Sequence, residues 1–138
     1  MSQPTCEYEY DFLGFIDVYE NLLRWIPDDY TVIDLGCYLA AQSYWFDQHF
    51  KYIGVDICKE TRFTPNNAIH FQMSIQDFLL YLFPQMEKTK YFGICSYVED
   101  FKATDLAYTA FHNIAIYYPG QLPRVKVAGK DVSEEWIE

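Results

Sequence analysis

The apolar positions of this chain follow two periods, one typical of helices and one typical of buried strands. Between Asp11 and Ile26 the apolar residues recur every three or four positions, and Pro27 ends the segment. The next segment, Thr31–Leu35, is a short and largely apolar run, as in a strand that is covered on both faces. The pattern therefore predicts an N-terminal helix at about residues 11–26, followed by a buried strand.

The same alternation continues after Leu35. It predicts helices and strands at Ala41–Phe50 (helix), Lys51–Ile57 (strand), Ala68–Met73 (strand), Ile75–Met86 (helix), Tyr91–Tyr97 (strand), Thr104–Tyr117 (helix) and Pro123–Val127 (strand). Strands that alternate with helices form a parallel sheet with helices on both faces and right-handed crossovers. The expected fold class is α/β, a doubly wound, mostly parallel sheet of about five strands, in a single domain over residues 1–138.

The charge of the chain narrows the range of partners. Its 138 residues include 20 acidic and 10 basic side chains, which gives a net charge of −10. Because like charges repel, this balance disfavours direct binding to nucleic-acid phosphates. The acidic residues near both ends favour solubility, with two alternatives, docking to a basic partner protein or mimicry of nucleic acid towards a nucleic-acid-binding protein.

Targeting to a membrane or to secretion is not predicted. No apolar run reaches the ~18 residues that cross a bilayer, and the N-terminal stretch MSQPTCEYEYDF lacks the basic region of a signal peptide. We therefore expect no membrane contact and a cytoplasmic location. Aromatic residues make up 20% of the chain, which predicts a substantial core, and those on the first helix are candidates for a homodimer surface.

The four cysteines, Cys6, Cys37, Cys58 and Cys95, are widely spaced and form no CxxC pattern. Three of them fall near the ends of predicted strands, where a free cysteine behaves as a small apolar residue. The spacing favours reduced structural thiols, with a three-cysteine metal site as the alternative. The histidines also lack metal-binding spacing, so no metal is expected.

The stretch Thr31–Ile57 has the layout of a nucleotide-binding βαβ unit. In such a unit the ligand lies at the carboxyl ends of the strands, and glycine in the first turn lets the backbone approach it. Gly36 follows the first predicted strand, and Asp56 lies twenty residues later, near the end of the second. This is the spacing at which a carboxylate meets ribose hydroxyls. The sequence therefore predicts a nucleotide-type site that contains Gly36 and Asp56.

The segments VIDLGC and YIGVDI resemble the first two motifs of class I methyltransferases, which use S-adenosylmethionine (SAM). The resemblance is strong over Thr31–Ile57. It implies that Asp34 is the acid at the end of the first strand, Gly36 the first glycine of the cofactor loop and Asp56 the ribose-binding acid. It also implies a Rossmann-like sheet, shortened here relative to the seven strands of the family.

The resemblance extends more weakly to other cofactor-binding positions. Tyr38 and Ala40 stand where the family has its second and third glycines. Met73–Leu79 resembles the stretch that lies over the adenine ring, and Asp77 lies slightly beyond the position of an acid that often meets the adenine amine. YYPGQLPRVKV resembles the segment in which a helix ends before the fifth strand. SAM is the implied cofactor.

Departures from the family leave two functions open. Tyr38 adds a large ring to the cofactor loop, and Ser96–Asp100 lacks the Asn/Asp-Pro-Pro-Tyr motif of amino-methylating members. One function is SAM-dependent methyl transfer to an unidentified small-molecule or protein substrate. The other is that of an inactive pseudo-methyltransferase that binds or regulates a protein partner. No catalytic residue stands out, so enzymatic activity is left open, and the direction of the Tyr38 ring becomes the structural question.

Overall fold

The computed structural model describes residues 22–38, 40–58, 65–87, 90–96, 101–117 and 123–135. Within these residues the chain forms one mixed sheet of seven strands with short helical segments packed against it. The strands are β1 (Thr31–Leu35), β2 (Lys51–Asp56), β3 (Ala68–Gln72), β4 (Tyr91–Ser96), β5 (Ile114–Tyr117), β6 (Arg124–Val127) and β7 (Lys130–Asp131). The fold class is therefore α/β, as predicted.

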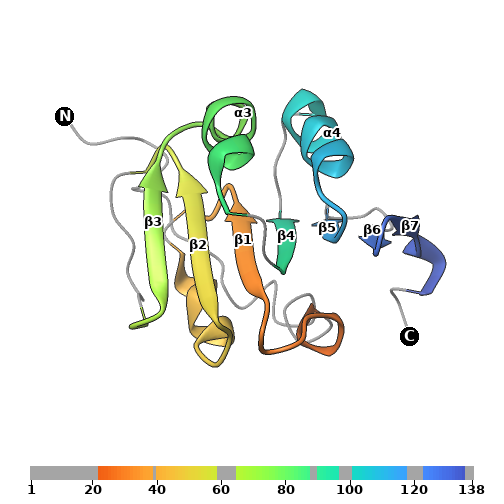
Figure 1. Cartoon of the computed structure of the whole chain (residues 1–138), viewed down its shortest axis with the longest axis horizontal. Coiled ribbons are helices and arrows are strands. Elements are labelled where there is room, and N and C mark those ends of the chain that lie inside the picture. Colours follow the sequence, from red (N-terminus) through yellow and green to blue (C-terminus); the bar gives the residue numbers. More distant parts are fainter. Residues whose placement is uncertain are drawn as a thin grey trace.

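The strands lie in the order β3-β2-β1-β4-β5-β6-β7, which Figure 1 shows across the molecule. The first five strands of the chain run parallel to one another. β6 and β7 run antiparallel and form a hairpin at one edge. The sheet is mostly parallel, as predicted, but the expected number of about five strands is wrong, because the described residues contain seven.

The helical segments between the strands are short. Residues 22–25 are helical, and residues 11–21 of the predicted first helix lie outside the described part of the chain. The other segments are η2 (Ala41–Phe46), α3 (Ile75–Asp77), η3 (Phe78–Leu82), η4 (Phe83–Gln85), α4 (Phe101–Ala110) and η5 (Ser133–Glu135). η2 and η4 are 3-10 helices and η3 is a π-helix. The single helix predicted at Ile75–Met86 is therefore three short segments in succession.

The predicted helix Thr104–Tyr117 is wrong over its C-terminal part, where the chain forms β5 instead. Asn113 stabilises the turn between α4 and β5 with both ends of its side-chain amide. Its Nδ2 donates to the carbonyl oxygen of Tyr91 at 3.2 Å, and its Oδ1 accepts the N–H of Ala128 at 2.9 Å. The strand predicted at Pro123–Val127 is consequently β6, the sixth in the chain rather than the fifth.

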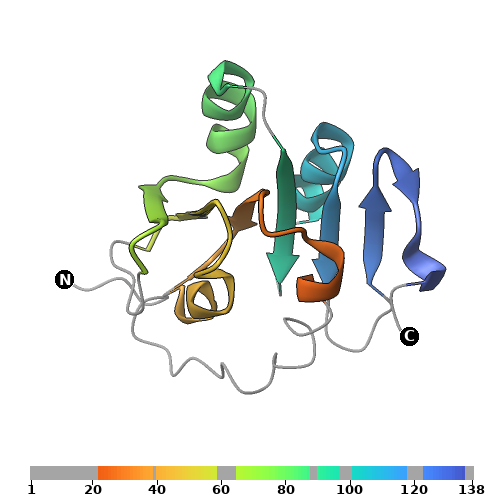
Figure 2. The same ribbon diagram turned by 60° about the horizontal axis from the view of Figure 1, so that its bottom comes forward.

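Different helical segments cover the two faces of the sheet, because side chains alternate along each strand. Val32 and Tyr52 point to one face, where they pack with Leu22 and with Phe46 of η2. Alternate residues of the same strands point to the opposite face and pack with α3, η3 and α4. Figure 2 shows α3 above the strands and η2 below them. The core is therefore two apolar layers with the sheet between them.

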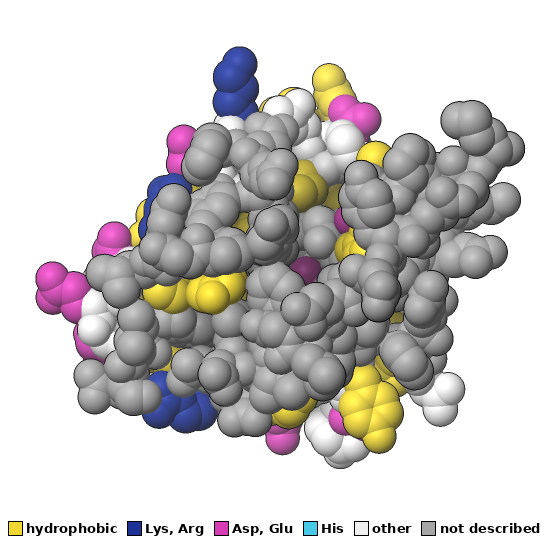
Figure 3. Space-filling model, turned by 180° about the vertical axis from the view of Figure 1, so that it is seen from behind, with side chains coloured by type: hydrophobic (Ala, Val, Ile, Leu, Met, Phe, Trp, Pro, Cys, Tyr) yellow, Lys and Arg dark blue, Asp and Glu magenta, His cyan; other side chains and the backbone are white. Residues whose placement is uncertain are grey.

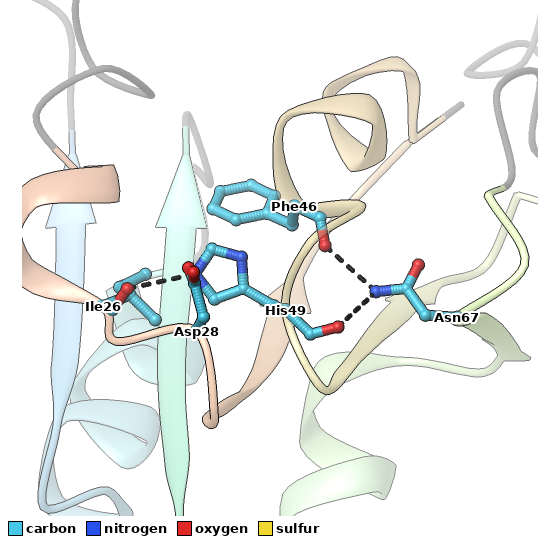
Figure 4. A network of polar contacts seen from close by, with 5 residues as sticks. All are labelled: Ile26, Asp28, Phe46, His49 and Asn67. Atoms are coloured by element: carbon cyan, nitrogen blue, oxygen red, sulfur yellow. Dashed lines mark hydrogen bonds and ion pairs between the residues drawn. The ribbon is translucent and has the colours of Figure 1, made fainter.

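A buried histidine and an asparagine tie the end of η2 to its surroundings (Figure 4). His49 Nε2 lies 3.0 Å from the carbonyl oxygen of Ile26 and 3.8 Å from Oδ1 of Asp28. Asn67 Nδ2 donates to the carbonyl oxygens of Phe46 and His49, at 3.0 and 2.9 Å. These contacts join the segment before β1, η2 and the start of β3, so η2 is fixed at its C-terminal end.

The described surface carries charges of both signs. Seen from behind, acidic side chains lie at several separate places and basic side chains at fewer (Figure 3). Among the helices that the structure describes, none has the length and apolar character needed to span a membrane.

Candidate functional site

The carboxyl end of β1 is the point at which the order of the parallel strands reverses. β2 lies on one side of β1 and β4 on the other, so the chain leaves β1 in one direction and later returns on the opposite side. At such a point the loops that follow neighbouring strands diverge and leave space for a ligand. The loop Gly36–Ala40 follows β1 directly and therefore lies at this point.

A cavity of about 210 Å³ opens at this end of the sheet. It is lined by Gly36, Asp56, Ile57, Met73, Ser74, Ile75, Gln76 and Ala103. Of the six predicted cofactor-binding residues, Gly36 and Asp56 lie in this wall, whereas the other four are not among the described residues that line it. The volume is below the ~300–1,000 Å³ of typical ligand pockets, so the cavity has room for a small ligand or for part of a larger one.

The loop after β1 has a left-handed backbone at three residues, and two of these residues are not glycine. Gly36, Tyr38 and Ala40 have φ values of 78°, 56° and 58°. This left-handed region costs a residue with a Cβ roughly 1–2 kcal/mol, whereas glycine adopts it freely. Such strain persists only where surrounding contacts determine the backbone. The loop is therefore held by its neighbours rather than by its own preferences.

Asp56 holds the loop from the end of β2. Its Oδ2 accepts the N–H of Tyr38 and its Oδ1 accepts the N–H of Cys58, both at 2.8 Å. The carbonyl oxygen of Val55 also accepts the N–H groups of Gly36 and Cys37, at 2.7 and 3.1 Å. A carboxylate offers about four lone-pair positions, so Asp56 supports the loop and still has acceptor capacity at the cavity wall.

Asp34 lies on β1 beneath the loop and is fully buried. Its Oδ2 accepts hydrogen bonds from the Tyr52 hydroxyl and, at 2.7 Å, from Nε2 of Gln42, while its Oδ1 has no hydrogen-bond partner among the described residues. Burial raises the pKa of Asp34 to about 6, against the lowering effect of the bonds from Tyr52 and Gln42. Asp34 therefore contacts the side chains of the protein itself, below the cavity wall.

Gln42 and Tyr52 are residues of this site that the sequence pattern did not single out. Both are buried, and Nε2 of Gln42 also donates to the carbonyl oxygen of Cys37 at 3.0 Å. Strand alternation places Tyr52 on the same face as Asp34, and this was the available sequence signal for it. Gln42 gave no comparable signal, because its contacts depend on how the loop turns before η2.

Tyr38 and Ala40 contribute to the loop after β1 through their backbone conformation and hydrogen bonds, and neither side chain lines the cavity as described. Ala40 is buried, packs in the core on the η2 side of the sheet and precedes η2 as its N-cap residue. Tyr38 is half-buried and its N–H binds Asp56. Because Tyr38 is absent from the described lining of the cavity, its ring is not part of that wall.

Asp77 follows the cavity wall at the start of α3. Ser74 is the N-cap residue of α3, and its Oγ accepts the N–H of Asp77 at 3.0 Å. Ser74, Ile75 and Gln76 line the cavity, whereas the Asp77 side chain is exposed. Its contact with a cofactor stays a prediction. Residues 97–100, which include the predicted acidic turn after β4, lie outside the described residues.

The cysteines near the site differ from one another. Cys37 and Cys95 are free and buried, as predicted, but Cys58 is disulfide-bonded, so the prediction of a reduced thiol is wrong there. Disulfides are rare in the cytosol, and the cytoplasmic location stays a prediction.

The Cys37 thiol lies 3.9 Å from Nδ1 of His70, as in a thiol–imidazole pair. Burial, with the nearby Asp34 and Asp56 carboxylates, raises the pKa of Cys37 well above its ordinary value. A buried, protonated thiol is a poor nucleophile, so this pair is structural. Among the described residues, no group of three His, Cys, Asp or Glu side chains could hold a metal ion.

Comparisons with known proteins identify no family for this chain. No protein-family model, no curated protein and no solved structure matches it. Any assignment of function therefore depends on the residues and geometry of the site.

Proposed function

We propose that this chain is a methyltransferase-like protein with a Rossmann-like sheet, whose cavity at the ends of β1 and β2 binds the nucleoside part of SAM. The observation that carries the proposal is the loop backbone, which is left-handed at Gly36, Tyr38 and Ala40. These are the three positions at which the methyltransferase family has glycine, and two of them here bear the cost of a side chain. Strained backbone of this kind is concentrated at binding and catalytic sites.

The residues around the cavity fit a nucleoside. Asp56 supplies a carboxylate acceptor for ribose hydroxyls, and Ile57, Met73 and Ile75 supply apolar surface for a purine ring. The net charge of −10 also favours a ligand with a positive sulfonium centre. SAM would supply the transferable methyl group, and the contribution of the protein would be to bind the cofactor and orient an acceptor in line with it.

A second function is favoured by a different observation. Both oxygens of Asp56 already accept backbone N–H groups of the protein, and the cavity is small. In an inactive methyltransferase-like module, Asp56 would hold only the loop, and the fold would serve to bind or regulate a protein partner. This alternative requires no cofactor.

Isothermal titration calorimetry with SAM and with its demethylated product, S-adenosylhomocysteine, separates the two functions. We expect a dissociation constant in the micromolar range for the wild-type protein. Asp56→Asn should weaken binding about tenfold or more, because a hydrogen bond to a charged group contributes ~1.5–3 kcal/mol. Glu135→Gln is the matched control, since Glu135 is exposed on η5 and lies outside the cavity wall.

Two results would contradict the proposal. If millimolar SAM produces no heat and does not shift the thermal unfolding midpoint of the wild-type protein, cofactor binding is refuted and the inactive module is favoured. If Glu135→Gln weakens binding as much as Asp56→Asn does, the effect is one of overall charge and Asp56 is not a ligand.

A further inference from the structure

We infer that Gln42 is the positioning residue of the cofactor loop, and that it compensates for the missing glycines by joining the carbonyl group of Cys37 to Asp34. We call these three groups the Asp34–Gln42–Cys37 clamp. The inference rests on the proposed function in so far as the loop binds a ligand, whereas the clamp itself is a property of the protein without ligand.

A single side-chain nitrogen makes both contacts of the clamp. Nε2 of Gln42 lies 2.7 Å from Oδ2 of Asp34 and 3.0 Å from the carbonyl oxygen of Cys37. An amide nitrogen carries two donor hydrogens, so both bonds form at once. A carboxylate is only an acceptor, so ionised Asp34 selects the orientation in which Gln42 presents its nitrogen to the loop.

The clamp acts on the peptide unit between Cys37 and Tyr38, which is held at both ends. Its carbonyl oxygen accepts the bond from Gln42, and its N–H donates to Oδ2 of Asp56 at 2.8 Å. The carbonyl oxygen also accepts the N–H of Ala40 at 2.9 Å. A rotation of this peptide unit would break all three bonds, so these contacts select one orientation of the loop.

This arrangement explains how a loop with few glycines keeps a left-handed backbone. Gly36 and Tyr38, the residues on either side of Cys37, are left-handed, and so is Ala40. Gln42 is 2% exposed and Asp34 0%, so the clamp operates away from water, where unpaired polar groups are costly. The conformation that glycine would adopt without cost is obtained here through buried hydrogen bonds between separate elements.

Hydrogen–deuterium exchange of the ligand-free protein tests the clamp directly. Gln42→Met keeps the length of the side chain and removes both bonds. We expect the backbone amides of Tyr38 and Ala40 to exchange about tenfold faster or more, as for a loss of ~1.4 kcal/mol. Tyr52→Phe is the matched control, because it removes another bond to the same Asp34 oxygen and leaves the bond from Gln42 to Cys37 in place.

A second substitution asks whether the clamp replaces glycine. In the Gln42→Met background, Ala40→Gly should restore slow exchange at Tyr38, because glycine adopts the left-handed conformation freely. Ala128→Gly is the matched control: it removes a Cβ from another left-handed residue, with φ 53° in the β6–β7 turn, and should not slow exchange at Tyr38. If Gln42→Met does not fold, Gln42→Asn replaces it, since its shorter side chain does not reach both partners.

Each outcome decides one question. Unchanged exchange at Tyr38 and Ala40 in the Gln42 variant overturns the clamp, as does equal acceleration by Tyr52→Phe or equal rescue by Ala128→Gly. SAM binding is measured separately in the same variants. Absence of binding in the wild-type protein refutes the proposed function and leaves the exchange result standing. Binding that persists in a Gln42 variant with unchanged exchange refutes the clamp alone.

Discussion

Two turns of this molecule contain a left-handed alanine, and they are held in different ways. Ala40 lies in the buried loop after β1 with φ 58°, and Ala128 lies in the exposed β6–β7 turn with φ 53°. In the hairpin the turn itself requires positive φ at both central residues, because that geometry matches the twist of the paired strands. Gly129 supplies the second one, with φ 83°. The loop after β1 is not a hairpin, so its conformation depends on contacts from elsewhere.

Backbone strain therefore has a local cause in the β6–β7 turn and a long-range cause in the loop after β1. The β6–β7 turn should keep its conformation as long as its two strands pair. The loop Gly36–Ala40 should lose its conformation when the side chains of Asp34, Gln42 or Asp56 are changed. Substitutions at each turn, with the other turn as reference, test this difference.

Asp34→Asn has the largest expected effect. Burial raises the pKa of Asp34 from 3.8 to about 6, so the folded protein retains a proton that the unfolded chain has already released. Stability should therefore fall as the pH rises from about 4 to about 6, by up to ~3 kcal/mol for about two pKa units, and stay lower above that range. Asp34→Asn should lack this fall in urea unfolding measured between about pH 4 and pH 7.

The control for this prediction is Asp29→Asn. Asp29 is exposed, and its hydrogen bond to Lys90 lowers its pKa, so any stability that it contributes is lost as the pH falls, which is the opposite direction. A constant difference in stability between the wild-type protein and Asp34→Asn across the pH range would contradict the prediction.

Gly54→Ala should distort the loop after β1 by overpacking the space beneath it. A Cβ at Gly54 would lie 2.8 Å from the sulfur of Cys37, directly beneath the loop. Overpacking of this kind costs ~1–3 kcal/mol. Gly93→Ala is the matched control, since its Cβ would lie 2.7 Å from the ring of Phe111, which packs on the opposite face of the sheet. Both variants should unfold at lower urea concentration, but only Gly54→Ala should speed exchange of the loop amides.

Asn113→Ala should loosen the hairpin without disturbing the loop. It removes the acceptor of the Ala128 N–H and the donor to Tyr91, at a cost of ~1–2 kcal/mol for two hydrogen bonds. Exchange of the Ala128 amide should become faster, while exchange at Tyr38 should match the wild-type rate after correction for global stability. Equal acceleration at both amides would mean that the two turns are coupled.

The smallest effects are expected for Ala40→Gly and Ala128→Gly in the otherwise wild-type chain. Each removes a Cβ from a left-handed position and should stabilise the protein by ~1 kcal/mol, less the entropy that glycine adds to the unfolded chain. Thermal unfolding midpoints measure both. A lower midpoint for Ala40→Gly, with a higher one for Ala128→Gly, would show that the Cβ of Ala40 contributes more through packing than it costs in strain.

Much of the sheet could be predicted from the sequence, because β1 to β4 are short segments with several apolar residues, separated by predicted helices or turn residues. β5 could not be predicted, since the short apolar run Ile114–Tyr117 is compatible with either a strand or the end of the preceding helix by periodicity alone. The signals that favoured a strand were the turn residue Asn113 and the β-branched Ile114 and Ile116. The strand predicted at Pro123–Val127 corresponds to β6, whereas β7 consists of the charged residues Lys130 and Asp131 and gives no apolar signal.

Only the site residues that lie at the ends of predicted strands could be predicted from the sequence. Gly36 and Asp56 follow from local spacing, and both line the cavity. Gln42 and Tyr52 come from different elements and meet Asp34 only after the chain has folded. Strand alternation predicts the face on which Tyr52 lies but not its contact with Asp34, and no local pattern identifies Gln42. The left-handed conformation of Tyr38 could not be predicted from the sequence either, because tyrosine disfavours it and only contacts with distant residues explain it.

The short strand β7 has a consequence for self-association. It consists of two residues, Lys130 and Asp131, both charged and exposed, and among the described strands it forms the edge of the sheet beyond β6. Edge strands are the places where a second chain most readily adds to a sheet and starts an aggregate. A strand this short, with charges of both signs, offers an incoming chain little to pair with. The β7 edge should therefore resist aggregation even when the protein is concentrated.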